Sequence, residues 1–213
     1  MNEQYGEANI EGGESIAKAK LMQFREDAGV AIWGTFIHNY VNEINKRQQQ
    51  VGGIYWEPAG RMPIDLFSFI REASRCFTLA QYLSAISMSS CAVELILNRD
   101  RRMKSLKIKG WIKLNIKNLV SAEKLGLPVY SLFSVNESLK QRSILFIDRR
   151  NRVNHGEVLS MLTTLSDYDG TAEDEALDQI TKAQKFVIEW FNASPDVQEG
   201  RIVNHRWPAE YHF

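Results

Sequence analysis

The chain has 213 residues, 44% hydrophobic and 24% charged, which fits one globular domain, or one domain with an appended segment, better than two full domains. The charges of its 26 basic and 26 acidic residues cancel, so the net charge gives no sign of a partner that is attracted by the overall electrostatic field of the protein. Any surface that binds nucleic acid must therefore be local. No run approaches the roughly 18 to 20 apolar residues that span a bilayer, and the polar, acidic start is unlike a signal peptide, so we expect a soluble cytoplasmic protein with no membrane partner.

The first 60 residues divide into a polar end, a helix and a loop. Residues 1–13 are acidic and Gly-rich, and we expect them to be mobile. From about Glu14 to Arg47, apolar side chains recur at intervals of three and four residues, the period of a helix. These side chains are Ile16, Leu21, Phe24, Val30, Trp33, Ile37, Tyr40, Val41 and Ile44. Glycines and a proline in residues 51–60 predict a loop, so residues 14–60 form an N-terminal helical segment and loop.

Residues 61–194 are predicted to form the main helical bundle. The stretch from about Ile64 to Arg99 predicts a central, largely buried helix that is broken at most once. Cys76 and Cys91 fall in this stretch, and in one continuous helix they would lie about 22 Å apart. That distance is too long for a disulfide bond, and the sequence has no CxxC pair or paired histidines, so we predict free thiols and no metal site.

The next two helices are predicted from their ends. One runs from roughly Lys109 to Leu125 and stops at Gly126-Leu127-Pro128, because glycine can cap a helix and proline cannot continue one. Ser134-Val135-Asn136-Glu137 is a capping-box pattern that predicts the start of the following helix. The residues that this helix would turn inward are Leu139, Ile144, Leu145 and Ile147.

The end of the chain predicts one more helix and a tail. Residues 158–165 are apolar, residues 166–170 have turn composition, and residues 172–191 have the spacing of an amphipathic helix. Residues 195–213 form an aromatic C-terminal tail that packs back onto the bundle, packs across a dimer or binds a partner. No strand pattern occurs, so we predict an all-α fold with a bundle of about five helices.

The sharpest local feature is a cationic cluster at the end of the helix that follows the capping box. It holds three arginines, two asparagines and a histidine in the run Asp148-Arg149-Arg150-Asn151-Arg152-Val153-Asn154-His155-Gly156. Histidine transfers protons near neutral pH and arginine can bind a phosphate through two hydrogen bonds, so together they suit RNA cleavage without a metal. A ribose 2′-hydroxyl would attack the neighbouring phosphorus, Arg150 would stabilise the developing charge and His155 would move the proton. The alternative is a C-terminal helix cap, in which the cations meet the helix dipole.

The spacing of the cluster argues against a complete site in one subunit. In an unbroken helix, Arg150 and His155 differ by about 140° in azimuth, whereas Asn151 and His155 share a face. The geometry improves if the helix ends near Asn154, or if a second subunit supplies the facing residues across a two-fold axis. A homodimer is therefore one of two arrangements that would complete the site.

The pattern of arginine, a polar residue, three further residues and histidine resembles the signature of the HEPN superfamily. It is written here as Arg150-Asn151-Arg152-Val153-Asn154-His155. The order of the surrounding elements is similar too, with a helix over residues 87–97, a stop at residues 125–128, Gly156 after the motif and a closing amphipathic helix. The resemblance covers roughly residues 64–192.

This resemblance implies a HEPN-like bundle, commonly dimeric, whose two subunits line a cleft that cuts RNA without metal or cofactor. Many such proteins act in toxin–antitoxin or phage-defence systems, so an antitoxin or regulatory protein becomes an expected partner besides RNA. Carried over to this chain, the motif assigns catalysis to Arg150, His155 and Asn151, with support from Glu94, Arg149 and Asn154. The alternative is a non-catalytic HEPN-like module that binds a protein partner or a nucleotide.

A basic run over residues 99–117, opposed only by Asp100, predicts a second contact with RNA phosphates. Trp111 would be a stacking platform there or a core residue. The residues predicted to bind RNA, one of them from the motif, are Arg101, Arg102, Lys104, Lys107 and Arg152. The alternative is an ordinary solvated face.

Overall fold

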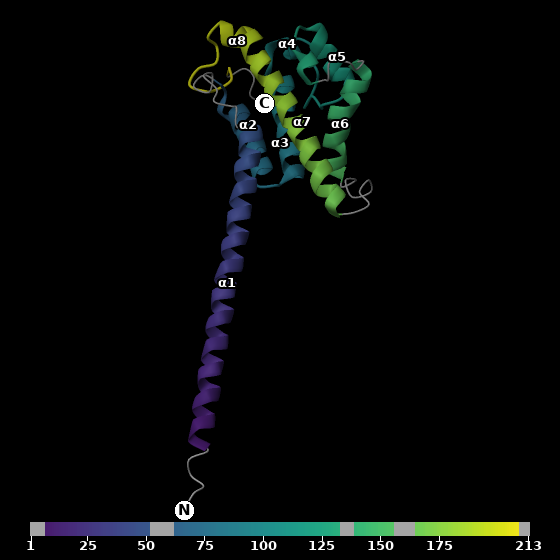
Figure 1. Cartoon of the computed structure of the whole chain (residues 1–213). Helices are drawn as coiled ribbons and strands as arrows, with labels where there is room; N and C mark the ends of the chain where they lie inside the picture. Colours follow the sequence, from purple (N-terminus) through teal and green to yellow (C-terminus); the bar gives the residue numbers. More distant parts are fainter. Residues whose placement is uncertain (1–6, 52–61, 133–138, 156–164, 209–213) are drawn as a thin grey trace, which may run out of the picture. The chain divides into compact units, whose positions relative to one another are not determined.

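The computed structural model describes residues 7–51, 62–132, 139–155 and 165–208, and the regular structure in these ranges is helical (Figure 1). The elements are α1 (Glu7–Val51), α2 (Ile64–Thr78), α3 (Tyr82–Arg99), α4 (Arg101–Lys104), α5 (Ile116–Lys124), the 3₁₀ helix η2 (Val129–Leu132), α6 (Leu139–His155), α7 (Leu165–Ala193) and α8 (Pro195–Gln198). Within the same ranges, the only β pairing is an isolated bridge between Val203 and Arg206. The prediction of an all-α bundle is confirmed.

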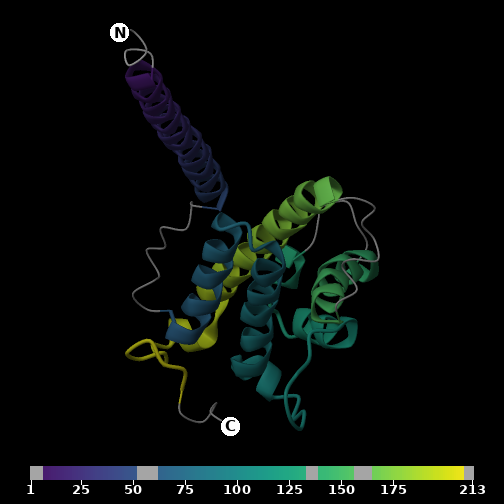
Figure 2. The same cartoon turned by 90° about the horizontal axis from the view of Figure 1, so that it is seen from below.

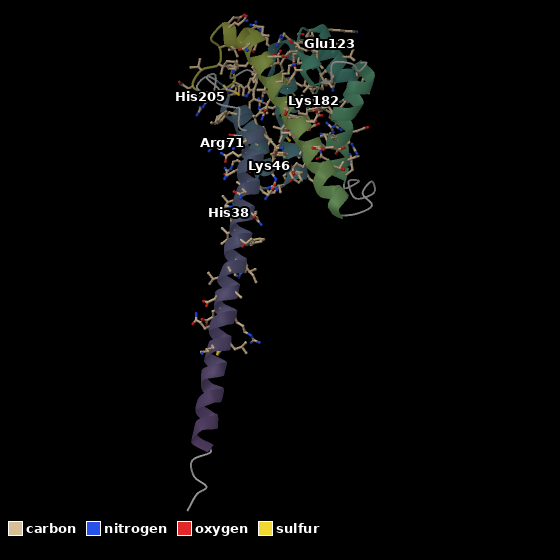
Figure 3. The ribbon with its side chains drawn as sticks, viewed as in Figure 1. His38, Lys46, Arg71, Glu123, Lys182 and His205 are labelled. Atoms are coloured by element: carbon tan, nitrogen blue, oxygen red, sulfur yellow. The ribbon has the colours of Figure 1, made fainter. Side chains whose placement is uncertain are left out.

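The chain divides into two compact units, residues 1–46 and residues 47–213, with the boundary inside α1. The helix predicted from about Glu14 to Arg47 is present and is longer, because α1 begins at Glu7 and ends at Val51. In the first unit, large apolar side chains between Leu21 and Val41 are exposed. Figure 3 shows side chains projecting from this helix, His38 among them.

Helices α2, α3 and α7 form the centre of the second unit. α2 packs against α3, α7 packs against both, and α6 packs against α3 and α5 (Figures 1 and 2). One core cluster contains Ile96 of α3 and Trp190 of α7, both fully buried. A second cluster contains Phe77, Ile86 and Ile180 and lies between the same three helices. The helix α6, which carries the candidate motif, therefore packs against α3, one of the central helices.

The long helix predicted from Ile64 to Arg99 is broken once, between Thr78 and Tyr82. Ala80 takes a left-handed conformation with φ +58°, and the N–H of Gln81 donates to the carbonyl of Cys76 at 2.7 Å, which closes the end of α2. Cys76 therefore lies on α2 and Cys91 on α3, so the continuous helix from which their distance was predicted is not present. Both thiols are nevertheless free.

The helix predicted from Lys109 to Leu125 is shorter than expected, because α5 begins only at Ile116. The segment before it is irregular and is held by side chains of α3. The amide of Asn98 donates to the carbonyl of Ile112 at 2.9 Å, and the N–H of Ile112 donates back to Asn98 Oδ1 at 2.7 Å. Asn115 then caps α5, and the predicted stop at Gly126 is confirmed by its φ of +80°.

The turn predicted over residues 166–170 was wrong, since α7 begins at Leu165 and continues through Gly170. A helix tolerates one glycine at a cost of about 1 kcal/mol, and serine and aspartate suit its first turn. The side chain of Ile147 is buried as predicted. Other predictions fall outside the described structure: the loop at residues 52–60, the capping box at 134–137, the apolar stretch at 158–164, and the side chains of Leu139, Ile144 and Leu145.

The aromatic tail packs onto the bundle as far as it is described. The indole of Trp207 lies 5.3 Å from that of Trp190 between ring centroids, and its Nε1 donates to Asp65 Oδ1 at 2.9 Å. The N–H of Ile64 also donates to the carbonyl of His205 at 2.9 Å. Of the three arrangements predicted for the tail, the structure shows the one in which the tail packs back onto the bundle. None of the described helices combines the length and the apolar character that a membrane crossing requires.

Candidate functional site

The motif lies on the last two turns of α6, and Arg150 is its most firmly held residue. Arg150 Nη2 donates to Glu94 Oε1 on α3 at 2.8 Å, and Nη1 donates to Asn151 Oδ1 at 3.0 Å. Glu94 Oε1 also accepts the backbone N–H of Leu114 at 3.0 Å. One buried carboxylate therefore joins α3, the irregular segment before α5 and the motif helix.

The Glu94–Arg150 pair orients the guanidinium without using all of its donors. A guanidinium carries five N–H donors. Two of the five are used by Glu94 and Asn151 within the described part of the chain. The Arg150 side chain is 23% exposed, so its remaining donors can reach a ligand that approaches from solvent. A phosphate could accept them, because arginine donates to two phosphate oxygens at once.

The two neighbouring arginines turn toward α7 instead. Arg149 Nη1 donates to Asp178 Oδ2, and Arg152 Nη2 donates to Glu175 Oε1 at 3.4 Å. Burial alone would raise the pKa of Asp178, but hydrogen bonds from Lys182 and Arg149 outweigh it and lower that pKa. These carboxylates place Arg149 and Arg152 in the contact between α6 and α7, while Arg150 binds Glu94 of α3.

Asn154 and His155 are exposed at the end of α6, which stays helical through His155. The helix does not end early in the way that would bring His155 beside Arg150. Five residues of regular helix separate the two by about 140° in azimuth, and Arg150 is bound to α3 while His155 faces solvent. Asn151, which binds the Arg150 guanidinium, lies one turn before His155 on the same face. One subunit therefore brings together Glu94, Arg150 and Asn151 but leaves His155 apart.

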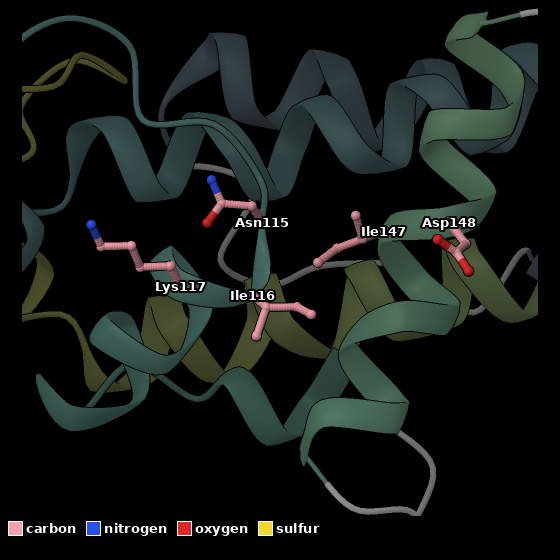
Figure 4. A pocket seen from close by; sticks show the side chains of 5 residues that line it. All are labelled: Asn115, Ile116, Lys117, Ile147 and Asp148. Atoms are coloured by element: carbon pink, nitrogen blue, oxygen red, sulfur yellow. The ribbon is translucent and has the colours of Figure 1, made fainter.

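A hollow of about 370 Å³ opens between the start of α5 and α6 (Figure 4). Ile116 and Ile147 form apolar walls, and Asn115, Lys117 and Asp148 supply polar groups. The hollow adjoins the arginine site along the chain, because Asn115 follows the residue whose N–H binds Glu94, and Ile147 lies nearly one turn before Arg150. The sequence did not predict this hollow, because its two sides, residues 115–117 and residues 147–148, are 30 residues apart and meet only in the fold.

Two arginines of the basic run, Arg101 and Arg102, bind other groups of the fold. Arg101 makes two hydrogen bonds with Glu199, at 2.9 and 2.8 Å. Arg102 donates to both oxygens of Asp100, at 3.0 and 2.9 Å, and to the carbonyl of Gly126 at 2.9 Å. Asp100 is buried and also accepts from Trp190 Nε1 at 2.8 Å, so this pair belongs to the core.

The lysines of the run differ from its arginines. Burial and the neighbouring Arg99 lower the pKa of Lys104. Lys107 is exposed and lies in a left-handed conformation with φ +50°. Trp111 is exposed, at 49%, and so is not a core residue. Among the predicted RNA-binding residues, Arg101, Arg102 and Arg152 pair with acidic side chains, whereas Lys107 is exposed. In the ranges that the structure describes, no group of three or more histidine, cysteine or acidic side chains is arranged to hold a metal ion.

Comparison with known proteins adds no assignment. No protein-family model, no curated protein and no solved structure matches the chain. The function must therefore be argued from the geometry of the site.

Proposed function

We propose that this chain is a metal-independent endoribonuclease of the HEPN type, acting as a homodimer. The observation that carries the proposal is the arginine site on α6. Glu94 and Asn151 each accept a hydrogen bond from the Arg150 guanidinium, and within the described part of the chain these bonds use two of its five N–H donors, so a phosphate could accept others. Holding a cation in place before substrate arrives favours the stabilisation of charge that develops during the reaction.

The proposed reaction needs a phosphate clamp and a proton carrier. The ribose 2′-oxygen forms a bond to the adjacent phosphorus, the bond from phosphorus to the 5′-oxygen breaks, and the products carry a 2′,3′-cyclic phosphate and a 5′-hydroxyl. Arg150 binds the phosphate oxygens on which negative charge accumulates. His155 accepts the proton of the 2′-hydroxyl or supplies one to the 5′-oxygen. Asn151 positions the Arg150 guanidinium through its own hydrogen bond.

The separation of Arg150 from His155 makes the second subunit part of the proposal. In one copy, Arg150 binds α3 while His155 is exposed at the end of α6. If two copies of α6 meet across a two-fold axis, His155 of one copy can approach Arg150 of the other, because such an interface brings the same patch against itself. Each dimer would then hold two composite sites.

The hollow beside α6 suits the base next to the scissile phosphate. A nucleobase has two flat apolar faces and a polar edge, and proteins read unpaired bases by stacking and by hydrogen bonds to that edge. Ile116 and Ile147 offer the apolar walls, and Asn115 and Asp148 offer polar groups at the rim. The proposed substrate is therefore unpaired RNA. An antitoxin or regulatory protein over the same surface would silence the enzyme, as the HEPN resemblance implies.

A second candidate function is a non-catalytic binding module. It is favoured by the carboxylate pairing of the motif, since Arg149, Arg150 and Arg152 each meet an acidic side chain of α3 or α7. Such pairing weakens the positive field that would draw RNA to the site. On this view, the surface of α6 binds a protein or a nucleotide and cleaves nothing.

Cleavage of RNA in EDTA tests the proposed function. We expect the purified chain to cut single-stranded RNA with excess EDTA and His155→Ala to lose at least a hundredfold in rate, since proton transfer by a positioned side chain contributes about 10² to 10⁴. His38→Ala is the matched control, because His38 is an exposed histidine of α1 far from the motif in sequence. Wild-type protein that is folded and leaves all RNA intact would favour the binding module.

A further inference from the structure

A buried glutamine on α7 binds both of the helices that build the arginine site. The side chain of Gln179 is fully buried, and its Nε2 donates to Ser90 Oγ on α3 and to the carbonyl of Phe146 on α6, each at 3.2 Å. Ser90 and Phe146 are buried as well. The proposed reaction does not use this amide, so its place between three helices needs an explanation of its own.

Both partners of Gln179 lie one helical turn before the residues of the arginine site. Ser90 precedes Glu94 by four residues on α3, and Phe146 precedes Arg150 by four residues on α6. An α-helix completes a turn in 3.6 residues. The two hydrogen bonds from Gln179 therefore join α3 to α6 one turn away from the Glu94–Arg150 ion pair.

The groups around the amide of Gln179 determine its orientation. The Phe146 carbonyl can only accept, and the Ser90 hydroxyl donates its hydrogen to the carbonyl of Ile86 at 2.9 Å, so the hydroxyl oxygen is left to accept. Both partners therefore require the nitrogen of the amide. Gln179 Oε1 has no hydrogen-bond partner within the described residues. Turning the amide over would place this oxygen against two acceptors.

The two hydrogen bonds set a position more than they stabilise the fold. A buried amide oxygen without a partner has a free-energy cost, which offsets the gain from the two bonds. An apolar side chain of the same length would remove that cost together with both bonds. Ser90 would keep its bond to Ile86, and the Phe146 carbonyl would keep the backbone N–H of Arg150 that an α-helix supplies.

We infer that Gln179 is a positioning residue that fixes α6 against α3 so that Arg150 meets Glu94. The Glu94 carboxylate is also bound to the N–H of Leu114, at 3.0 Å, so a shift of α6 along α3 separates the guanidinium from it. A displacement of about 1 Å in a catalytic constellation is enough to lower a rate by about a hundredfold. The effect on RNA cleavage rests on the proposed function, whereas the effect on the ion pair does not.

The coupling between Glu94 and Arg150 tests this role without an assay of RNA. Urea unfolding of Glu94→Gln, Arg150→Gln and the double variant gives the factor by which the two side chains reinforce each other in the folding equilibrium constant. Gln179→Met keeps the length of the side chain and removes the amide. We expect this factor to fall about fivefold or more when the three variants are remade in the Gln179→Met background. Gln179→Met alone should unfold near the wild-type midpoint.

Gln184→Met is the matched control. Gln184 lies on the same helix, and its Nε2 donates to Ser74 Oγ of α2 at 3.4 Å, so it makes the same kind of contact with a different helix. Its substitution should leave the coupling unchanged. Ser90→Ala is a second test, because it removes the acceptor on α3 and leaves Gln179 in place. The coupling should fall with Ser90→Ala as it does with Gln179→Met.

Rates of RNA cleavage measure the consequence for the reaction. For Gln179→Met we expect kcat to fall about tenfold or more while KM stays within about twofold, since a displaced guanidinium weakens binding of the transition state more than of the substrate. Equal coupling in the wild-type and Gln179→Met backgrounds would overturn the inference. So would an equal loss of coupling in Gln184→Met, which would mean general loosening of α7. If the coupling falls while the wild type cuts no RNA, Gln179 still positions Arg150 and the proposed nuclease function fails alone.

Discussion

Glu94 is the residue on which the candidate site most depends. Its carboxylate is buried, and a single oxygen, Oε1, accepts from Arg150 at 2.8 Å and from the N–H of Leu114 at 3.0 Å. A buried carboxylate is costly unless it is paired and hydrogen-bonded. Arg150 supplies both the charge partner and a hydrogen bond to Glu94, and the proposed reaction uses the same arginine. The stability of the fold and the position of Arg150 are therefore linked.

The Glu94→Gln substitution removes the charge of this side chain and keeps its shape, so it tests the contribution of the charge alone. The amide oxygen can still accept from Leu114, but Arg150 loses its counter-charge, so we expect the free energy of unfolding in urea to fall by about 1–3 kcal/mol. RNA cleavage should fall as well, because Arg150 is no longer held. Glu123→Gln is the control, on the exposed surface of α5 (Figure 3). Equal unfolding midpoints for the two variants would contradict the role given to Glu94.

At the scale of residues, the sequence named candidate side chains but not which of them pair with each other. Glu94 and Arg150 were both candidates, but they lie 56 residues apart and meet only because α6 packs on α3. Residue type alone could not distinguish Arg149 from Arg150 either, since the two arginines are neighbours in the cationic cluster. The fold does distinguish them, because one binds α7 and the other binds α3.

At the scale of elements, the helix predicted before residue 116 is absent because of tertiary contacts. Residues 108, 112 and 116 are isoleucines at four-residue spacing, which imitates a helix, yet buried Asn98 and Glu94 bind the backbone there and keep it irregular. The end of α2 was hard to place for a different reason. Ala80 adopts a conformation that usually signals glycine, so no residue type marked it. By contrast, the end of α5 was predicted because Gly126 marks it.

Asn98→Ala tests whether this hydrogen bonding determines the irregular segment. The substitution leaves both the N–H and the carbonyl of Ile112 without their buried partner, so we expect a loss of about 2–4 kcal/mol in urea unfolding. Hydrogen exchange at the Ile112 amide should accelerate well beyond that of the core helices. Asn192→Ala, at an exposed position on α7, should change neither quantity. An Asn98→Ala protein with wild-type stability would mean that packing alone holds the segment.

At the scale of the whole molecule, the equal numbers of basic and acidic residues appear in the structure as ion pairs. Arginines that looked available for RNA are joined to acidic residues far away in the sequence, as Arg101 is to Glu199 and Arg152 to Glu175. Composition could not reveal this, because it counts charges without their partners. The all-α fold, in contrast, was predictable, since helical periodicity is local. The proposed function rests on the smaller set of groups near Arg150, and on a second subunit that the proposal requires.

The central claim is a composite site built by two subunits, and mixing two inactive variants tests it directly. Arg150→Gln and His155→Ala chains would be denatured together, refolded in equal amounts and assayed for RNA cleavage in EDTA, beside each variant refolded alone. Each variant alone should be inactive, and the mixture should regain about a quarter of wild-type activity, because half of the random dimers are mixed and each of those holds one intact site. A mixture as inactive as its components, beside an active wild type, would contradict the shared site.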